Sequence, residues 1–349
     1  MSFLRALYYG DTHVDFFGRR RTWWTISAIA IGVALGSLAL TGLNFSLDFR
    51  GGVAVQVVNQ SAAELTEVRA AMGRIGLADA RIQLLEEGAA IRVQTGDLTD
   101  EGERVLVEAV AQVAGVDVEE TSLTSVGPTF GSQISESAIR ALVLFLVAVS
   151  LFITWRFEWK MAMAALAALF HDLVLTFGAY SLFGFEVTPA TVIAILTILG
   201  YSLYDTVVVF DKVRENEIEA QGHVPYADIV NVSMNEVLMR SIMTSLTSLL
   251  PVGSLLFVGS FLLGAATLQD FALALFVGIA VGTYSSIFVA SPLLATWKET
   301  EESWLRVRRR QVRVPDQLDA VPAALSASPA SIAPVGATPR PPKRRRKRK

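Results

Sequence analysis

The sequence contains no cysteine and only three histidines, which excludes several kinds of functional site. Without thiols the chain forms no disulfide and no thiolate metal centre, although this absence does not identify the cellular compartment. The histidines, His13, His171 and His223, lie in separate segments, so we expect no His-based metal cluster. The sequence also has no P-loop, no dinucleotide-binding glycine pattern and no nucleophile–base constellation. We therefore predict that the protein is not an enzyme and uses no metal or organic cofactor.

Charge is scarce in six long apolar runs. Hydrophobic residues make up 52% of the chain, and the mean hydropathy is +0.46. Both values are typical of an integral membrane protein with one sizeable polar region. Each run is close to the ~20 residues that a helix needs to cross a bilayer. We predict an α-helical membrane protein with six transmembrane helices, at residues 23–41, 138–155, 161–183, 189–210, 241–259 and 270–295.

The distribution of Lys and Arg around these runs predicts the orientation of the chain. The connections 184–188 and 260–269 contain neither residue, and the polar region 44–135 falls on that same side. Both termini are then cytoplasmic. We predict five parts: a cytoplasmic N-terminus 1–22, a first span 23–42, an extracytoplasmic domain 43–135, a five-helix bundle 136–297 and a disordered, basic cytoplasmic tail 298–349.

The polar region has the pattern of a small α+β domain. Ser61-x-x-Glu64 is a capping-box pattern, which predicts the start of a helix that reaches about residue 75. A second helix is predicted at 98–113, and strands are predicted at 53–58, 81–85, 91–95 and 116–123. The resulting β-α-β-β-α-β order predicts a ferredoxin-like external domain.

Two stripes of small residues predict close helix packing. The first run carries Ala28, Gly32 and Gly36 at four-residue intervals. The last run carries Ala274, Gly278, Gly282, Ser286 and Ala290 at the same spacing. We expect each stripe to face a neighbouring helix.

The end of the chain is polybasic, with eight Lys and Arg residues between positions 340 and 349. Clusters of this kind at a cytoplasmic face are usually sequence-independent electrostatic patches. We predict that the tail contacts membrane lipids and binds no specific nucleic acid.

Asp205 is the one carboxylate in the fourth run before the charged cluster at 211–215. At 1.5 Å per residue it lies roughly 9 Å deeper than Asp211, which marks the end of the run. A charge in hydrocarbon costs at least ~2.5 kcal/mol, so such groups usually face a bundle interior or a water path. We predict that Asp205 binds and releases a proton. The alternative is an acid near the inner interface that reaches water.

Three further residues are candidates to act with Asp205 in proton coupling. Asp172 is either a second acid on the proton path or a structural hydrogen-bond partner between helices. Its neighbour His171 is interpreted as a hydrogen-bonded structural residue. Arg240 and Thr244 share one face of the fifth run. The arginine is either the cation that keeps Asp205 ionised or a snorkelling anchor at the cytoplasmic helix end.

Three motifs can be compared with known families: LDFRGG at 47–52, the His171-Asp172 pair, and GYSLYDTVVVFDKVREN at 200–216. Together they resemble the SecF family, the smaller partners in the SecD–SecF pair of protein-export membrane proteins. The resemblance covers about residues 15–300 and excludes the tail. The family usually has Asn where this chain has Tyr204, just before the key acid. That departure puts the hydrogen bonding around Asp205 in question.

The resemblance implies half of an RND-type transporter, with SecD supplying the other half. It implies that the pair works beside the SecYEG channel in the bacterial inner membrane and draws on the proton-motive force. A YajC-type accessory protein and the translocating preprotein are further expected partners. Asp205, Arg240 and Thr244 match the family's functional residues, and we expect Asp48, Arg50, Gly51 and Gly52 to couple the bundle to the external domain.

Two functions of other classes also fit the sequence. The six spans could form a scaffold for the translocon that carries no proton, in which case Asp205 is only a hydrogen-bond partner between helices. The chain could also be half of an RND-type small-molecule efflux protein, although residues 44–135 are few for a drug-binding domain.

Overall fold

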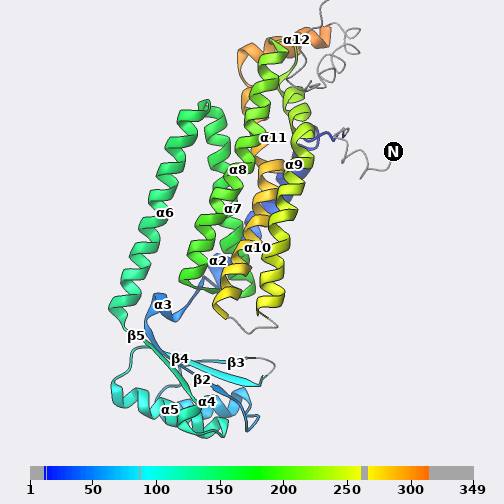
Figure 1. Cartoon of the computed structure of the whole chain (residues 1–349). Helices are drawn as coiled ribbons and strands as arrows, with labels where there is room; N and C mark the ends of the chain where they lie inside the picture. The colour runs from blue at the N-terminus through cyan, green and yellow to red at the C-terminus, as the bar shows by residue number, and fades with distance from the viewer. Residues whose placement is uncertain (1–11, 13, 86–87, 261–265, 314–349) are drawn as a thin grey trace, which may run out of the picture.

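Six helices that are long and apolar enough to cross a membrane stand side by side in the structure (Figure 1). The structure is a computed structural model that describes residues 12, 14–85, 88–260 and 266–313. The prediction of six apolar helices is confirmed. They are α2 (Arg20–Leu40), α6 (Pro128–Arg156), α7 (Trp159–Phe183), α8 (Pro189–Ala220), α9 (Tyr226–Ser254) with the π-helical η3 (Leu255–Ser260), and α10 (Ala266–Ser285) with the π-helical η4 (Ser286–Ala290) and α11 (Ser291–Lys298).

Glycines let α10 approach α8 more closely than side chains would allow. A Cβ atom added at Gly278 would lie 2.2 Å from the side chain of Ile198. One added at Gly282 would lie 2.9 Å from Cβ of Ser202. The predicted packing of the small-residue stripe in the last span is therefore confirmed, and it brings the polar residues of α8 and α10 together.

The small-residue stripe predicted in the first span is corrected by the structure. Gly32 and Gly36 have no atom within 4 Å of an added Cβ, and Ala28 is exposed. Instead α2 packs on α7 through another face. There, a Cβ atom added at Gly178 of α7 would lie 2.2 Å from the Cβ atom of Ala34. Spacing identifies small residues on one face, but it does not say which face meets the bundle.

Residues 52–126 fold into a four-stranded antiparallel sheet with two helices, in the order β-α-β-β-α-β. The strands lie in the order β3-β4-β2-β5. Val53, Val55 and Ile91 on the sheet pack against Val68 and Leu106 on the helices. The elements are β2 (Gly52–Val58), α4 (Leu65–Arg74), β3 (Arg81–Leu85), β4 (Ala90–Thr95), α5 (Asp100–Ala114), the 3-10 turn η2 (Val118–Glu120) and β5 (Ser122–Val126).

Local capping and turn formation shift several predicted boundaries in this unit. Glu64 and Glu67 form the capping box of α4, while Ser61 donates to the Val113 carbonyl at 2.5 Å. The last strand begins at Ser122 rather than at 116, because η2 occupies the preceding residues. The predicted domain boundary at 135/136 falls inside α6, which starts at Pro128 with the proline in its first turn.

Two short elements join this unit to the helices. β1 (Asn44–Phe45) pairs in parallel with β6 (Glu186–Val187), which lies between α7 and α8. The one-turn helix α3 (Leu47–Arg50) follows β1 and packs on the start of α6, where a Cβ on Gly131 would lie 2.9 Å from the Phe49 carbonyl oxygen. The sheet is therefore attached both to the α7–α8 connection and to α6.

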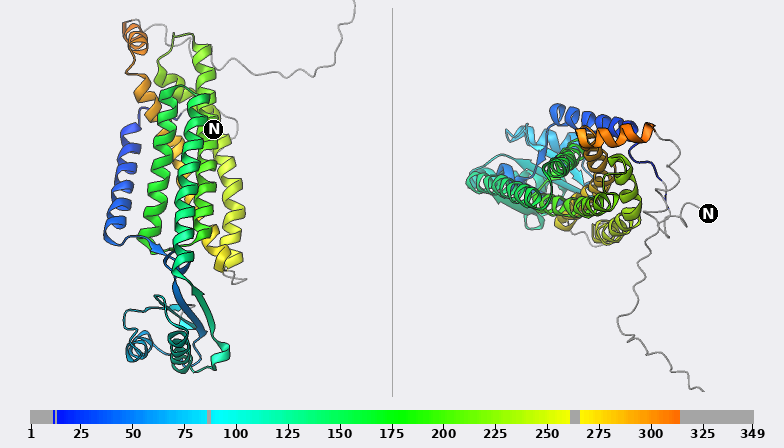
Figure 2. Two further views of the ribbon diagram at one scale, coloured as in Figure 1. Left: turned by 90° about the vertical axis from the view of Figure 1, so that its left-hand side faces the viewer. Right: turned by 90° about the horizontal axis from the view of Figure 1, so that it is seen from above.

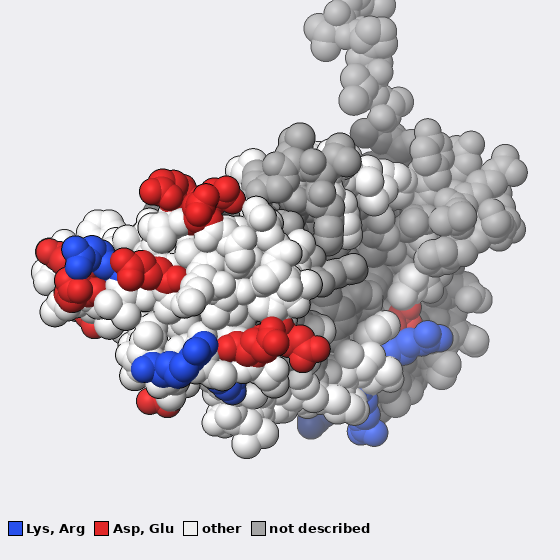
Figure 3. Space-filling model, turned by 90° about the horizontal axis from the view of Figure 1, so that it is seen from below, with Lys and Arg blue, Asp and Glu red and all other residues white. Residues whose placement is uncertain are grey.

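The four-stranded sheet and its two helices, residues 52–126, are called the sheet unit below. The sheet unit and the last described helix lie at opposite ends of the bundle (Figure 2). The face of the sheet unit that points away from the bundle carries acidic and basic side chains dispersed over uncharged surface (Figure 3). At the other end, α12 (Glu302–Arg313) forms within the segment predicted to be disordered from residue 298. Trp304 explains this difference, because its ring packs edge-on against Tyr226 at 5.1 Å between centroids. The polybasic residues 340–349 lie outside the described residues.

Candidate functional site

Asp205 lies inside the bundle, with only 6% of its surface exposed. Ser241 on α9 donates to Oδ1 at 2.7 Å, and Ser286, the first residue of η4, donates to Oδ2 at 2.5 Å. No ion pair to Asp205 occurs among the residues that the structure describes. The carboxylate is therefore held by neutral hydroxyls from two other helices, as expected for a buried acid that must not be left without partners.

Asp172 forms a second buried carboxylate cluster on the neighbouring helix α7. It is 1% exposed and accepts a hydrogen bond from Ser202 of α8 at 2.5 Å. Its other oxygen lies 3.3 Å from Nδ1 of His171. Ser202 and Asp205 are three residues apart on α8, so the two clusters occupy successive turns of one helix, about 4.5 Å apart along its axis.

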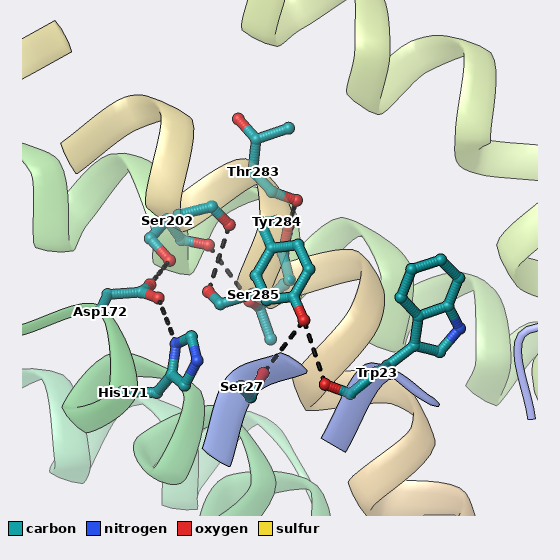
Figure 4. A network of polar contacts seen from close by, with 11 residues as sticks. Trp23, Ser27, His171, Asp172, Ser202, Thr283, Tyr284 and Ser285 are labelled. Carbon is teal, nitrogen blue, oxygen red and sulfur yellow. Dashed lines mark hydrogen bonds and ion pairs between the residues drawn. The ribbon is translucent and has the colours of Figure 1, made fainter. Parts of the chain in front are cut away.

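Five of the six long helices contribute polar side chains to this region. Figure 4 shows Asp172 between His171 and Ser202, with Tyr284 beside the imidazole. The Tyr284 hydroxyl lies 3.1 Å from Ser27 Oγ and 3.2 Å from the Trp23 carbonyl oxygen of α2. In the described part of the chain, no group of three or more His, Asp or Glu side chains is placed to hold a metal ion. The polar groups of the interior are thus carboxylates, hydroxyls and one imidazole, brought together from five helices.

Arg240 does not contact Asp205 in this structure. Its guanidinium donates to the Tyr204 hydroxyl at 3.1 Å, on the exposed side of α8 and α9. Thr244 donates to the carbonyls of Arg240 and Ser241, at 2.9 and 3.0 Å. The expected direct pairing of Arg240 with Asp205 is therefore absent, because adjacent residues on α8 point to different sides. The helix turns by about 100° per residue, which carries Tyr204 outward when Asp205 points inward.

This geometry answers the question raised by Tyr204. Its side chain is 52% exposed and makes no hydrogen bond to Asp205. The bond that Tyr204→Asn removes, to Arg240, is exposed. Exposed contacts of charged groups contribute about 0–1 kcal/mol, so we expect the free energy of unfolding to fall by no more than about 1 kcal/mol. Thermal unfolding of the purified full chain measures this effect.

Ser241→Ala provides the contrast, because it removes a hydrogen bond to a buried carboxylate. Bonds to charged groups contribute about 1.5–3 kcal/mol, so this variant should be clearly less stable than Tyr204→Asn. Equal destabilisation by the two changes would contradict the assignment of Tyr204 to the outer side.

The residues of the LDFRGG motif lie far from the carboxylates, at the connection to the sheet unit. Asp48 accepts from the hydroxyl of Ser46, the residue before α3, at 3.3 Å, and Arg50 is exposed. Gly51 and Gly52 are buried and have φ angles of 71° and 117°, in the region that favours glycine. The motif therefore forms the bend between the membrane helices and the first strand of the sheet.

Sequence reasoning missed the three serines that hold the two acids. Ser241 and Ser202 gave no signal, because isolated serines in apolar helices are common. Ser286 did belong to the predicted small-residue stripe, but it was assigned to packing alone. Its position at the start of a π-helical segment is a further indication, since such segments are frequent at functional sites.

The sequence of this chain matches a family model and several curated proteins. Residues 106–300 match the model of the C-terminal part of the protein export membrane proteins SecD and SecF. The chain is 41% identical over 306 residues to a protein translocase subunit SecF from Streptomyces coelicolor, with 87% of this chain and 82% of that protein covered. It is 43% identical over 314 residues to the SecF subunit of Mycobacterium tuberculosis, with 86% and 71% covered.

A solved structure is also similar to this one. The crystal structure of SecDF from Thermus thermophilus, a translocon-associated membrane protein, superposes with a TM-score of 0.74 at 37% sequence identity. The match covers 83% of this chain and 39% of that one. The chain thus spans about two fifths of the larger protein.

Proposed function

Because the chain belongs to the SecD/SecF family of protein-export membrane proteins, we propose that it is a SecF-type auxiliary subunit of protein translocation driven by the proton-motive force. The observation that carries this proposal is Asp205, a buried carboxylate held by serines of two other helices and, among the residues that the structure describes, by no cation. Acidic side chains inside a membrane bundle are costly and are usually functional, and Asp205 lies where three helices meet. The chemistry that this function requires of Asp205 is the binding and release of a proton.

Protonation of Asp205 changes the hydrogen bonds that its two oxygens can make. The ionised carboxylate accepts from Ser241 and Ser286, one on each oxygen. Once one oxygen carries a hydrogen it becomes a donor, so the serine facing it must rotate or move away. α8, α9 and η4 meet at this point, and the packing of all three responds. A difference of ~1.4 kcal/mol between two arrangements shifts their populations tenfold.

Movement of the helices can reach the sheet unit by two connections. The pairing of β1 with β6 joins the sheet unit to the outer ends of α7 and α8, and the Ser46 amide donates to the Val187 carbonyl at 2.9 Å. An ion pair between Arg92 of β4 and Glu186 of β6, at 3.7 Å, adds a direct contact. The bend at 48–52 and α3 form the second connection, to α6.

The sheet unit, with its strand order and β-α-β-β-α-β connectivity, is a ferredoxin-like domain on the extracytoplasmic side, and both termini are cytoplasmic. SecD is the partner half, which the fused SecDF relatives support. The SecYEG channel, a YajC-type protein and the preprotein are the further partners, and lipids contact the basic tail. Protons are the only coupling species, and the subunit is not an enzyme.

The test is Asp205→Asn in the full chain together with its SecD partner. Asparagine keeps the size and accepts one serine hydrogen bond, but it cannot bind a proton. We expect export into membrane vesicles to lose its stimulation by a proton gradient, while copurification of SecD is retained. Stimulation equal to that of the unmodified chain would refute the proposal and favour a scaffold.

Asp211→Asn is the matched control for this experiment. Asp211 lies on the same helix, but it is partly exposed and pairs with Arg156 at 2.7 Å. Surface ion pairs contribute only about 0–1 kcal/mol, so this change should leave gradient-dependent export nearly unchanged.

A further inference from the structure

His171 is a buried titratable group that the mechanism described above does not use. It is 4% exposed, and Nδ1 lies 3.3 Å from the Asp172 carboxylate. With Asp172 ionised, Nδ1 carries the hydrogen and Nε2 presents a lone pair. Nε2 is buried and has no hydrogen-bond partner among the described residues. Leaving such an acceptor unsatisfied is costly, so its presence in the interior requires an explanation.

The groups around the imidazole leave Nε2 free to accept a proton. The ring of Tyr284 from α10 stacks on the imidazole, with 6.1 Å between centroids. Its hydroxyl is directed to Trp23 and Ser27 of α2 (Figure 4). The titratable groups facing His171 are therefore Asp172 from α7 and Tyr284 from α10. The other polar groups, Ser27 on α2 and Ser202 on α8, do not titrate.

The position of His171 relates it to Asp205 through Asp172. Ser202 donates to the Asp172 oxygen that His171 does not contact, and it precedes Asp205 by one turn of α8. Gly282 allows α10 to close over this turn, since an added Cβ would lie 2.9 Å from that of Ser202. Because α8 runs from the sheet-unit end of the bundle towards α12, Asp172 and Ser202 lie nearer the sheet unit than Asp205 does.

We propose that His171 is the group that receives protons for this site and passes them to Asp172, whose partner Ser202 lies one turn of α8 from Asp205. A proton bonds to Nε2, the Nδ1–H bond breaks, and that hydrogen bonds to Oδ1 of Asp172. A neutral imidazole and an ionised acid thus become a neutral imidazole and a neutral acid, with one proton taken up. This inference rests on the proposed function and assigns its entry point to the side of the sheet unit.

His171→Asn separates proton transfer from structure. The asparagine amide can still donate to Asp172 from near the place of Nδ1, but it has no second nitrogen and does not titrate. In vesicles that contain the full chain and its SecD partner, we expect gradient-stimulated export to fall about a hundredfold or more, within the range that positioned proton-transfer groups contribute. The remaining stimulation should also lose its dependence on the pH of the proton-supplying side.

His223→Asn is the matched control, because His223 is exposed in the α8–α9 connection. It should retain the stimulation and its pH dependence. If His171→Asn fails to fold, as judged by thermal unfolding and SecD copurification, His171→Gln is measured in the same way. An amide variant that folds and keeps the normal pH profile would overturn the role of His171.

The failure of this inference can be told from failure of the proposed function. If Asp205→Asn abolishes the stimulation and the His171 variants do not, protons reach Asp205 by another route and the proposed function stands. If neither substitution changes the stimulation, the proton-driven function itself is wrong.

Discussion

Valine at position 278 is expected to separate α10 from α8 and to destabilise the membrane bundle. An added Cβ would lie 2.2, 2.6 and 2.7 Å from three side-chain atoms of Ile198. Two of these atoms are bonded directly to Cβ of Ile198, so rotating the end of that side chain does not relieve the contact. Overpacking costs about 1–3 kcal/mol and occasionally more. Separation of the helices also moves Ser286, two turns further along, away from Asp205.

The measurement is thermal unfolding of purified Gly278→Val, together with gradient-stimulated export. Gly32→Val is the matched control, because nothing lies within 4 Å of an added Cβ on Gly32 of α2. We expect the Gly278 variant to have a lower unfolding temperature and to lose stimulation, and the Gly32 variant to keep the stability of the chain. Equal stability of the two variants would contradict the close contact between α8 and α10.

Alanine at position 52 is expected to disrupt the sheet unit where its first strand begins. Gly52 has a φ of 117°, and an added Cβ would lie 2.2 Å from the carbonyl oxygen of Thr95 on the paired strand β4. Strained backbone of this kind costs about 1–3 kcal/mol by itself. The collision is with backbone rather than with a flexible side chain, so β2 must move away from β4. We expect the sheet unit to become sensitive to protease while the membrane helices persist.

Gly76→Ala is the control that separates the collision with Thr95 from the strain of a positive φ angle. Gly76 also has a positive φ, 80°, but nothing lies within 4 Å of an added Cβ. It should incur only the backbone penalty, about 1–2 kcal/mol. Limited proteolysis of the full chain compares the two variants, and equal protection of the sheet unit would show that the contact with Thr95 is unimportant.

The sequence alone determined the membrane helices, because hydrocarbon leaves the backbone few alternatives. A chain segment in lipid must satisfy its own hydrogen bonds, so each long apolar run has to be a helix. The same constraint made Asp205 conspicuous as an acid far from the charged end of its run. The order of strands and helices in the sheet unit also followed from local patterns, although a 3-10 turn displaced the last strand.

Only the tertiary structure decided which side chains surround the acids, because those partners are distant in the sequence. Ser241 lies 36 residues from Asp205, and Ser286 lies 81 residues from it. Helical spacing places residues on a face, but it leaves the rotation of that face towards a neighbour undetermined. That rotation turned Arg240 towards Tyr204 and exposed the stripe of Ala28, Gly32 and Gly36. Packing against the neighbouring helices determined the rotation of α9 and of α2, since the apolar faces of a membrane helix are nearly equivalent in lipid.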